Sequence, residues 1–319
     1  IIMFQPPKPA AVVLVGADYS SNLAVPHNVL GWRGLQGIAA LSRTERPWAI
    51  FNPASLVLLQ GGPVELKLPE TWDEIVNNLA RTTRGQKTLL FVLALHGMTT
   101  ADSAYLVPNQ AANPTSEALD LKRVIESMAQ LPPEQNKILV LEGSQIPAEW
   151  HQGMLYNDFA RRLQDLEPEI AKVRNLWVLS GCDVDQLCWT SEGLGRSAFL
   201  HFIIEALRGK AAGDDRRLSL EELHGYVRDN VRNWAWNARR VIQEPVLLPR
   251  AENGGRGKSA APANHRKASE IYLASVDNAA SPEAPSSWDR TAAEEPWKRC
   301  QAMDALVPHP SVYSPRRWR

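Results

Sequence analysis

Two uninterrupted apolar runs constrain the fold of this chain more than any other feature of its sequence. The first covers residues 88–95 and stops at His96-Gly97, and the second covers residues 137–141 and stops at Glu142-Gly143-Ser144. Runs without alternating polar residues are typical of strands that are buried on both faces of a parallel sheet. The sequence therefore predicts an α/β domain built on two such strands.

The remaining elements alternate between strands and helices. Further strands are predicted at residues 11–15, 55–59, 175–180 and 245–249, the last of them an edge strand with prolines at its ends, and a short extended piece at 104–108. Apolar spacing predicts helices at residues 30–41, 71–81, 121–131, 159–166, 197–207 and 219–234. This order indicates a mostly parallel sheet with helices on both faces.

Polar residues at three of these helices match capping signals. Thr71 with Glu74, and Ser219 with Glu222, have the spacing of a capping box, in which each side chain binds the other residue's backbone N–H. Ser197 precedes the apolar face of another helix and can cap it alone. We therefore expect helices to begin just after Thr71, Ser197 and Ser219.

A change of composition after Arg250 predicts the domain boundaries. Residues 1–250 form the α/β domain, and residues 251–287 are rich in Ala, Ser, Pro, Asn and Gly, as expected of a flexible linker. That linker holds at most one ordered piece, at residues 271–276. Residues 288–319 regain tryptophans and are expected to start a further segment or tail.

Charge and cysteine content exclude several classes of partner. The chain has 35 basic and 35 acidic side chains, which gives no reason to expect a nucleic-acid surface or a polybasic membrane anchor. Its three cysteines do not suggest a disulfide framework, so a reducing, cytoplasmic location is expected. No apolar run approaches the roughly 20 residues that span a bilayer. No Cys/His spacing suggests zinc, and we expect neither metal nor cofactor.

The candidate site residues follow the ends of the predicted strands. Ligands of open parallel sheets collect just past the carboxyl ends of the strands, which is where His96 and Ser144 fall. Cys182 ends the next strand and could face the same crevice, or be buried and inert. Asp18, Asp183 and Asp185 either line a pocket for a basic side chain or are solvated loop carboxylates.

Two short motifs do not meet their own requirements. Gly257-Lys258-Ser259 matches the end of a phosphate-binding loop, but Glu252 occupies the position of the required glycine. Gly143-Ser144 faintly resembles the nucleophile elbow of serine hydrolases, but Glu142 and Ile146 occupy its two glycine positions. Neither supports a function.

Three segments together resemble the caspase and metacaspase-like peptidases. Ala94-Leu95-His96-Gly97 is similar to the family's His-Gly element, and residues 139–144 are similar to its Asp-x-Cys element. Residues 178–186, with 194–197 and 207–209, resemble the small-subunit half of bacterial members. The resemblance covers about residues 11–250 and implies a three-layer α/β sandwich of the caspase-like fold and a cysteine-type endopeptidase activity.

The sequence departs from this family at the chemical centre. Aligned element to element, Ser144 stands where the family has its nucleophilic cysteine, and Glu142 stands where it has Asp. A serine hydroxyl is much less acidic than a thiol and needs an accurately placed base. The sequence therefore favours a weak or inactive pseudo-peptidase that binds a peptide or protein partner. The alternative is an active endopeptidase with His96 as base and Ser144 or Cys182 as nucleophile.

Overall fold

The chain splits into two compact units, and all residues that the computed structural model describes lie in the first, residues 1–277. The described residues are 10–22, 24–41, 62–83, 87–100, 102–111, 117–148, 154, 156–213, 215, 217–250 and 265–275. The strand predicted at 55–59, the Gly257-Lys258-Ser259 motif and the segment 288–319 lie outside them.

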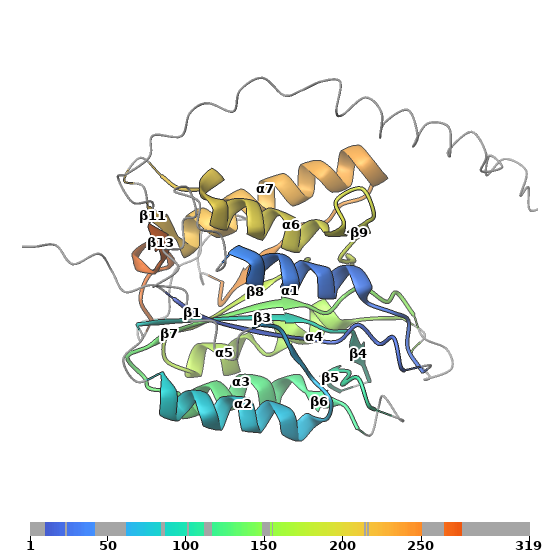
Figure 1. The fold of residues 1–319 in the computed structure, drawn as a ribbon, viewed down its shortest axis with the longest axis horizontal. Coiled ribbons are helices and arrows are strands. Elements are labelled where there is room, and N and C mark those ends of the chain that lie inside the picture. Colours follow the sequence, from blue (N-terminus) through green and yellow to red (C-terminus); the bar gives the residue numbers. More distant parts are fainter. Residues whose placement is uncertain are drawn as a thin grey trace, which may run out of the picture. The chain divides into compact units, whose positions relative to one another are not determined.

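The core of the unit is a mostly parallel sheet of six strands (Figure 1). Its order is β12-β8-β7-β3-β1-β2, and only β12 runs antiparallel to its neighbour. The strands are β1 (Ala11–Gly16), β2 (Val64–Glu65), β3 (Thr88–Ala94), β7 (Asn136–Glu142), β8 (Leu176–Ser180) and β12 (Val246–Leu248). This confirms the predicted parallel sheet and its edge strand near residue 247.

Helices cover both faces of this sheet and give three layers (Figure 1). Two hydrophobic clusters lie between the layers, one on each face. One face carries α1 (Val29–Leu41), α6 (Ala198–Glu205) and α7 (Leu220–Arg239). The other carries α2 (Pro69–Thr82), α3 (Leu121–Ser127), α4 (Phe159–Asp165) and α5 (Glu167–Lys172). The apolar runs are buried because both of their faces meet helices.

Small sheets extend the connections beyond the core. One three-stranded sheet contains β4 (Gly97–Thr99), β5 (Ala104–Leu106) and β6 (Leu119–Asp120), which confirms the extended piece expected at residues 104–108. A hairpin of β9 (Thr190–Ser191) and β10 (Arg196–Ser197) precedes α6. The first of these sheets begins directly after His96, so it fixes the path of the chain leaving that residue.

The capping predictions hold at two helices and fail at the third. Ser197 Oγ accepts from Leu200 N, and Ser219 forms the reciprocal box with Glu222. The prediction for Thr71 is wrong, because α2 begins two residues earlier at Pro69, whose fixed φ suits the first turn of a helix. Thr71 Oγ1 instead accepts from Leu68 N at 3.4 Å, inside the first turn. The helix after Ser219 also continues to Arg239, beyond the expected residue 234.

A short segment after Arg250 packs on the domain. Strand β13 (Tyr272–Ser275) pairs antiparallel with β11 (Arg217–Ser219), and Ile271 and Leu273 are buried in the cluster beneath α7. The compact unit therefore reaches past residue 250 and includes the ordered piece that was expected near residue 271. Its apolar side chains explain why a composition rich in small and polar residues does not mark the end of the core there.

None of the helices in the described part of the chain combines the length and the apolar character needed to cross a membrane.

Ser219→Ala should lower the free energy of unfolding by about 1 kcal/mol, because it removes the cap of a long helix that packs on the core. The matched control is Thr71→Ala, which we expect to change the free energy of unfolding by less than about 0.5 kcal/mol, since Thr71 lies inside α2 and is not its N-cap residue. Urea denaturation of both variants measures the difference, and equal losses would contradict the assignment of these two helix starts.

Candidate functional site

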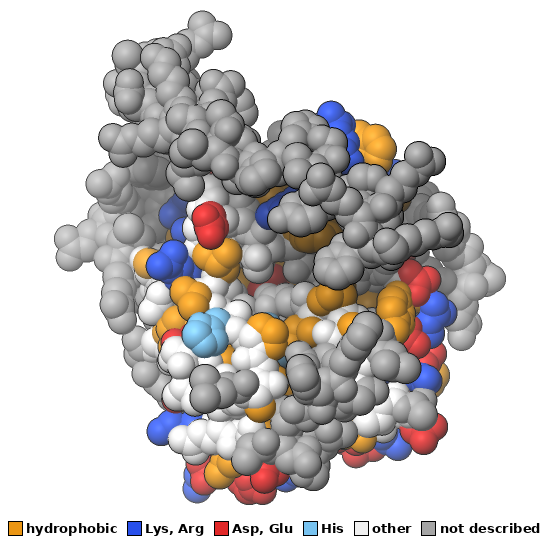
Figure 2. Space-filling model, turned by 90° about the vertical axis from the view of Figure 1, so that its right-hand side faces the viewer, with side chains coloured by type: hydrophobic (Ala, Val, Ile, Leu, Met, Phe, Trp, Pro, Cys, Tyr) orange, Lys and Arg blue, Asp and Glu red, His pale blue; other side chains and the backbone are white. Residues whose placement is uncertain are grey.

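Parallel pairing of β3 with β7 brings the two predicted site segments together. The strands pair in register from Thr88 with Asn136 to Ala94 with Glu142. Beyond them, Gly97 N donates to Gly143 O at 2.8 Å, so the loop after His96 stays hydrogen-bonded to the loop before Ser144. Figure 2 shows a hollow in the face toward which these strands end. The two strands that the sequence predicted are therefore parallel neighbours in the sheet.

Tyr19, which sequence reasoning did not select, supports His96 from the neighbouring strand end. The two rings stack with centroids 4.6 Å apart and an angle of 14° between their planes. The Tyr19 hydroxyl donates to Val107 O at 2.6 Å and accepts from His96 N at 3.0 Å. Burial raises the pKa of Tyr19 above its usual value, so this hydroxyl stays protonated and can make both bonds.

The hydrogen bonds of His96 define which ring nitrogen can act as a base. Its Nε2 lies 2.7 Å from the carbonyl oxygen of Pro26, and a carbonyl only accepts, so Nε2 carries the proton. Nδ1 is then the unprotonated nitrogen, and it is buried without a hydrogen-bond partner among the described residues. Burial lowers the pKa of His96 to about 4, although the bond to Pro26 opposes the shift. The ring is therefore neutral at neutral pH and a weak base.

Ser144 follows β7, the neighbour of the strand that leads to His96, but no hydrogen bond among the described residues joins it to the imidazole ring. The residue is only 3% exposed, and its carbonyl accepts from Cys188 N at 2.7 Å. Within the described residues no hydrogen bond joins Ser144 to His96. The apo arrangement therefore positions a histidine and a serine on neighbouring loops without forming the nucleophile–base contact of about 2.6–3.2 Å that catalysis requires.

A buried carboxyl group lies two residues before Ser144. Glu142 is fully buried, and neither carboxylate oxygen has a hydrogen-bond partner in the described structure. Burial raises the pKa of Glu142 to about 7, and the neighbouring Ser197 and Gln145 side chains only partly oppose this. Gln145 Nε2 is also buried and unpartnered. The carboxyl group and this amide are therefore polar neighbours that no hydrogen bond of standard geometry joins.

Cys182 packs in a small cluster with Ala160 and Cys188, and His96 does not belong to this cluster. Its thiol is fully buried and faces the carbonyl oxygen of Gln186 at 3.4 Å. A hydrogen bond with Cys182 together with burial raises the pKa of Cys188 well above its usual value. Both thiols are free, and their burial is the environment of inert rather than reactive cysteines.

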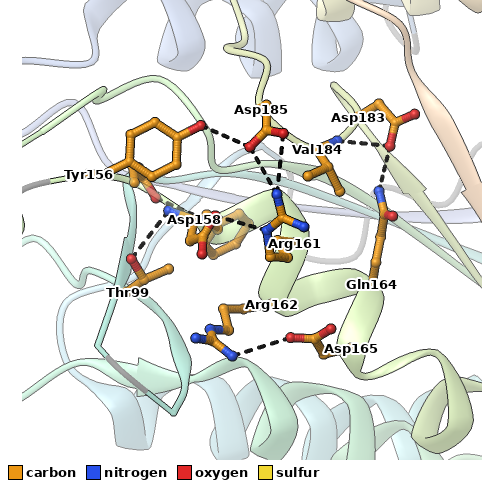
Figure 3. Close-up of polar contacts among 12 residues, drawn as sticks. Thr99, Tyr156, Asp158, Arg161, Arg162, Gln164, Asp165, Asp183, Val184 and Asp185 are labelled. Carbon is orange, nitrogen blue, oxygen red and sulfur yellow. Dashed lines mark hydrogen bonds and ion pairs between the residues drawn. The ribbon is translucent and has the colours of Figure 1, made fainter.

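Asp183 and Asp185 are both occupied by partners within the domain (Figure 3). Asp183 Oδ1 accepts from Gln164, Val184 N and Arg250, which hold its pKa below the usual value even though partial burial acts in the opposite direction. Asp185 binds Arg161 with both carboxylate oxygens. A basic side chain of a ligand would have to compete with Arg250 and Arg161 for these two groups.

Asp18 occupies a different place, at the end of β1. Its carboxylate accepts from the N–H and the hydroxyl of Ser20, and its carbonyl accepts from Asn28 N at 2.8 Å. The segment between Asp18 and Asn28 includes Pro26, whose carbonyl orients His96. Asp18 therefore helps to shape the turn that holds the histidine.

Asn157 and Phe159, which sequence reasoning also missed, contact both of the loops that carry His96 and Ser144. Asn157 Nδ2 donates to Gly97 O at 3.0 Å and to Ile146 O at 2.6 Å, one acceptor from each loop. The Phe159 ring lies so close to Gly97 and Gly143 that a Cβ at either position would collide with it. The glycines of His96-Gly97 and Gly143-Ser144 are a sequence signal for such close approaches. No pattern in the sequence predicts the role of Asn157.

The chemistry available to this arrangement is hydrogen bonding and, at most, weak base catalysis. Within the described ranges, no group of three or more His, Cys, Asp or Glu side chains is arranged to hold a metal ion. What the site offers is an oriented neutral imidazole, a serine hydroxyl, a largely neutral carboxyl group and an amide. These groups suit a ligand that both donates and accepts hydrogen bonds.

The His96 ring should stay neutral until the pH falls to about 4, since its charged form is disfavoured by burial. Its pKa in the unfolded chain is about 6.5, so the group stabilises the fold fully above that pH and loses this contribution as the pH falls toward 4. An NMR titration of the histidine ring protons checks this, with His96→Ala identifying the signal. A midpoint near 6.5 would contradict the buried, oriented ring.

Glu142→Gln should remove a loss of stability that occurs as the pH rises. The pKa of Glu142 is raised from 4.5 to about 7, so its stabilising contribution is complete below pH 4.5 and is lost as the pH passes 7. The shift corresponds to up to about 3 kcal/mol. The difference in unfolding free energy between variant and wild type should therefore favour the variant more at pH 8 than at pH 5. An unchanged difference would show that Glu142 is solvated.

No family model matches the chain, and no curated protein matches it.

Proposed function

We propose that this chain is a peptide-binding domain related to the caspase and metacaspase-like peptidases, in which peptide cleavage is weak or lost. The observation that carries the proposal is His96 Nδ1, a buried nitrogen without a hydrogen-bond partner among the described residues, near the end of β7 where no hydrogen bond of standard geometry satisfies the Glu142 carboxyl group or Gln145 Nε2. Buried polar groups in folded proteins are normally hydrogen-bonded, so a group left without a partner needs one, which an ordered water or a ligand can supply. The backbone of an extended peptide supplies both N–H donors and C=O acceptors.

The three-layer sandwich supports the same proposal. A mostly parallel sheet covered by helices on both faces is compatible with the fold that the resemblance implies, and its strand order reverses between β1 and β3. Ligands of such sheets bind outside the carboxyl ends of the strands at the point where the order reverses. Tyr19 follows β1 and His96 follows β3, so the stacked pair marks that point.

Weak cleavage follows from the nucleophile and from its base. Ser144 replaces the thiol that the family resemblance implies, and a serine becomes nucleophilic only when a base accepts its proton. His96 has a pKa of about 4 and no hydrogen bond to Ser144. Both properties act against formation of an acyl-enzyme.

One observation favours the alternative, an active endopeptidase. Pro26 O fixes the tautomer and the orientation of His96, which is the role of the third group in a nucleophile–base pair. Catalytic contacts are often long in unliganded enzymes and shorten when substrate binds. An active enzyme would therefore use His96 Nδ1 to accept the proton of Ser144.

Ser144→Cys tests whether the site keeps the geometry of a Cys–His pair. If the alternative holds, His96 accepts the thiol proton and the new thiol should react with iodoacetamide about tenfold faster at pH 7 than an ordinary exposed thiol, because a neighbouring imidazolium lowers a cysteine pKa. If the ring stays neutral, as its lowered pKa indicates, the new thiol should react no faster. The matched control is Ser21→Cys, at an exposed serine in the same half of the domain. His96→Ala should slow labelling at position 144 and leave position 21 unchanged.

Peptide protection and peptide cleavage separate the two functions. Peptides that contain Arg, Lys or Asp should slow labelling of Ser144→Cys if they occupy the site, while the wild-type chain leaves them intact. Labelling that no peptide slows would contradict the binding function. Cleavage by the wild-type chain that is lost in Ser144→Ala would establish the endopeptidase instead, and cleavage that alkylation of Cys182 blocks would assign the nucleophile to that thiol.

A further inference from the structure

The carboxyl-terminal end of α7 carries an exposed aromatic and basic surface that the candidate site does not use. Trp236 and Ile242 are each 54% exposed. The guanidinium of Arg240 lies 5.8 Å from the ring centroid of Trp236, and that of Arg239 lies 5.5 Å from the ring centroid of Trp189. We call these five residues the tryptophan–arginine patch.

The backbone at the end of α7 holds this patch together. Arg240 has a left-handed conformation with φ 56°, and its N–H donates to Trp236 O while Val241 N donates to Ala235 O. The chain therefore reverses sharply at Arg240, a position where glycine is the usual residue. Arg239 donates to Thr190 O at 3.1 Å, which ties the helix end to β9. Figure 1 shows β9 beside that end of the helix.

Ion pairing leaves this end of the helix positively charged. Residues 228–244 contain four arginines and two acidic residues. Asp229 pairs with Arg228 at 2.9 Å and Glu244 with Arg232 at 3.7 Å. Across the described residues, Arg239 and Arg240 have no ion-pair partner, and each is instead stacked over an indole ring. Two guanidinium groups thus lie next to exposed apolar surface, with their charges uncompensated.

We propose that the tryptophan–arginine patch binds an acidic peptide segment of a partner protein. Carboxylates of the segment would pair with Arg239 and Arg240, and an apolar side chain between them would pack on Trp236 and Ile242. Aromatic and arginine side chains are the residue types that dominate binding energy at protein interfaces. The exposed part of this surface, Trp236 with Arg240 and Ile242, shares no residue with the peptide site proposed at His96 and Ser144, although Trp189 follows Cys188, whose N–H binds Ser144 O. Its function does not depend on that proposal.

A single strand of nucleic acid fits the patch less well. Such strands bind along grooves that present a row of cations to successive phosphates, in addition to aromatic stacking platforms. The patch has two unpaired arginines, and the whole chain has a net charge of zero. Its charge therefore matches a few carboxylates better than a phosphate backbone.

Fluorescence anisotropy with the full chain tests the proposal. The probe is a fluorescein-labelled synthetic peptide in which Glu, Leu and Ser alternate, and its counterpart has Gln in place of Glu. We expect saturable binding of the Glu peptide and binding about tenfold weaker for the Gln peptide, because charge-assisted hydrogen bonds are lost. The double variant Arg239→Gln with Arg240→Gln should weaken binding of the Glu peptide by about the same factor.

Matched variants distinguish the patch from the rest of the chain. Arg228→Gln, on the same helix but paired with Asp229, should leave binding unchanged. Trp236→Ala should weaken it, and circular dichroism should show that each variant is folded. Equal binding by wild type and the double arginine variant, or preferential binding of an oligothymidine probe, would overturn the proposal.

Discussion

The pairing of β3 with β7 is the interaction on which the candidate site depends. Both strands are fully buried along their seven residues, and their register sets Ala94 opposite Glu142. Burial of each large apolar side chain contributes about 1.5–3 kcal/mol. Several such side chains together outweigh the cost of keeping one unpaired carboxyl group, so the sheet can hold Glu142 in a place where it would not remain by itself.

The two titratable groups at this edge respond to pH in opposite directions. Burial disfavours the charged form of each, which lowers the pKa of His96 and raises that of Glu142. Around pH 6 the imidazole is neutral and the carboxyl group is mostly protonated. The centre of the site is then close to uncharged, which suits the neutral amide groups of a peptide better than an ion.

Local sequence patterns were enough to predict most of the secondary structure, whereas the details of the site depend on tertiary contacts. Uninterrupted apolar runs predicted β3 and β7, and their polar ends located His96 and Ser144, because strand direction follows from the alternation with helices. The start of α2 was misplaced at Thr71, since Pro69 starts the helix earlier. The roles of the Pro26 carbonyl and Asn157 could not be predicted, because they arise from chain segments that meet only in the folded sheet.

The ring of Phe159 touches both glycines that flank the site, and this contact makes α4 a mechanical link. The helix begins at Phe159 and carries Arg161 two residues later, which grips Asp185 on the loop after β8 (Figure 3). That ion pair is exposed and therefore weak, whereas the Phe159 ring is buried against both glycines. The spacing between the two site loops is thus set by the packing of one aromatic ring and not by the charges at the surface.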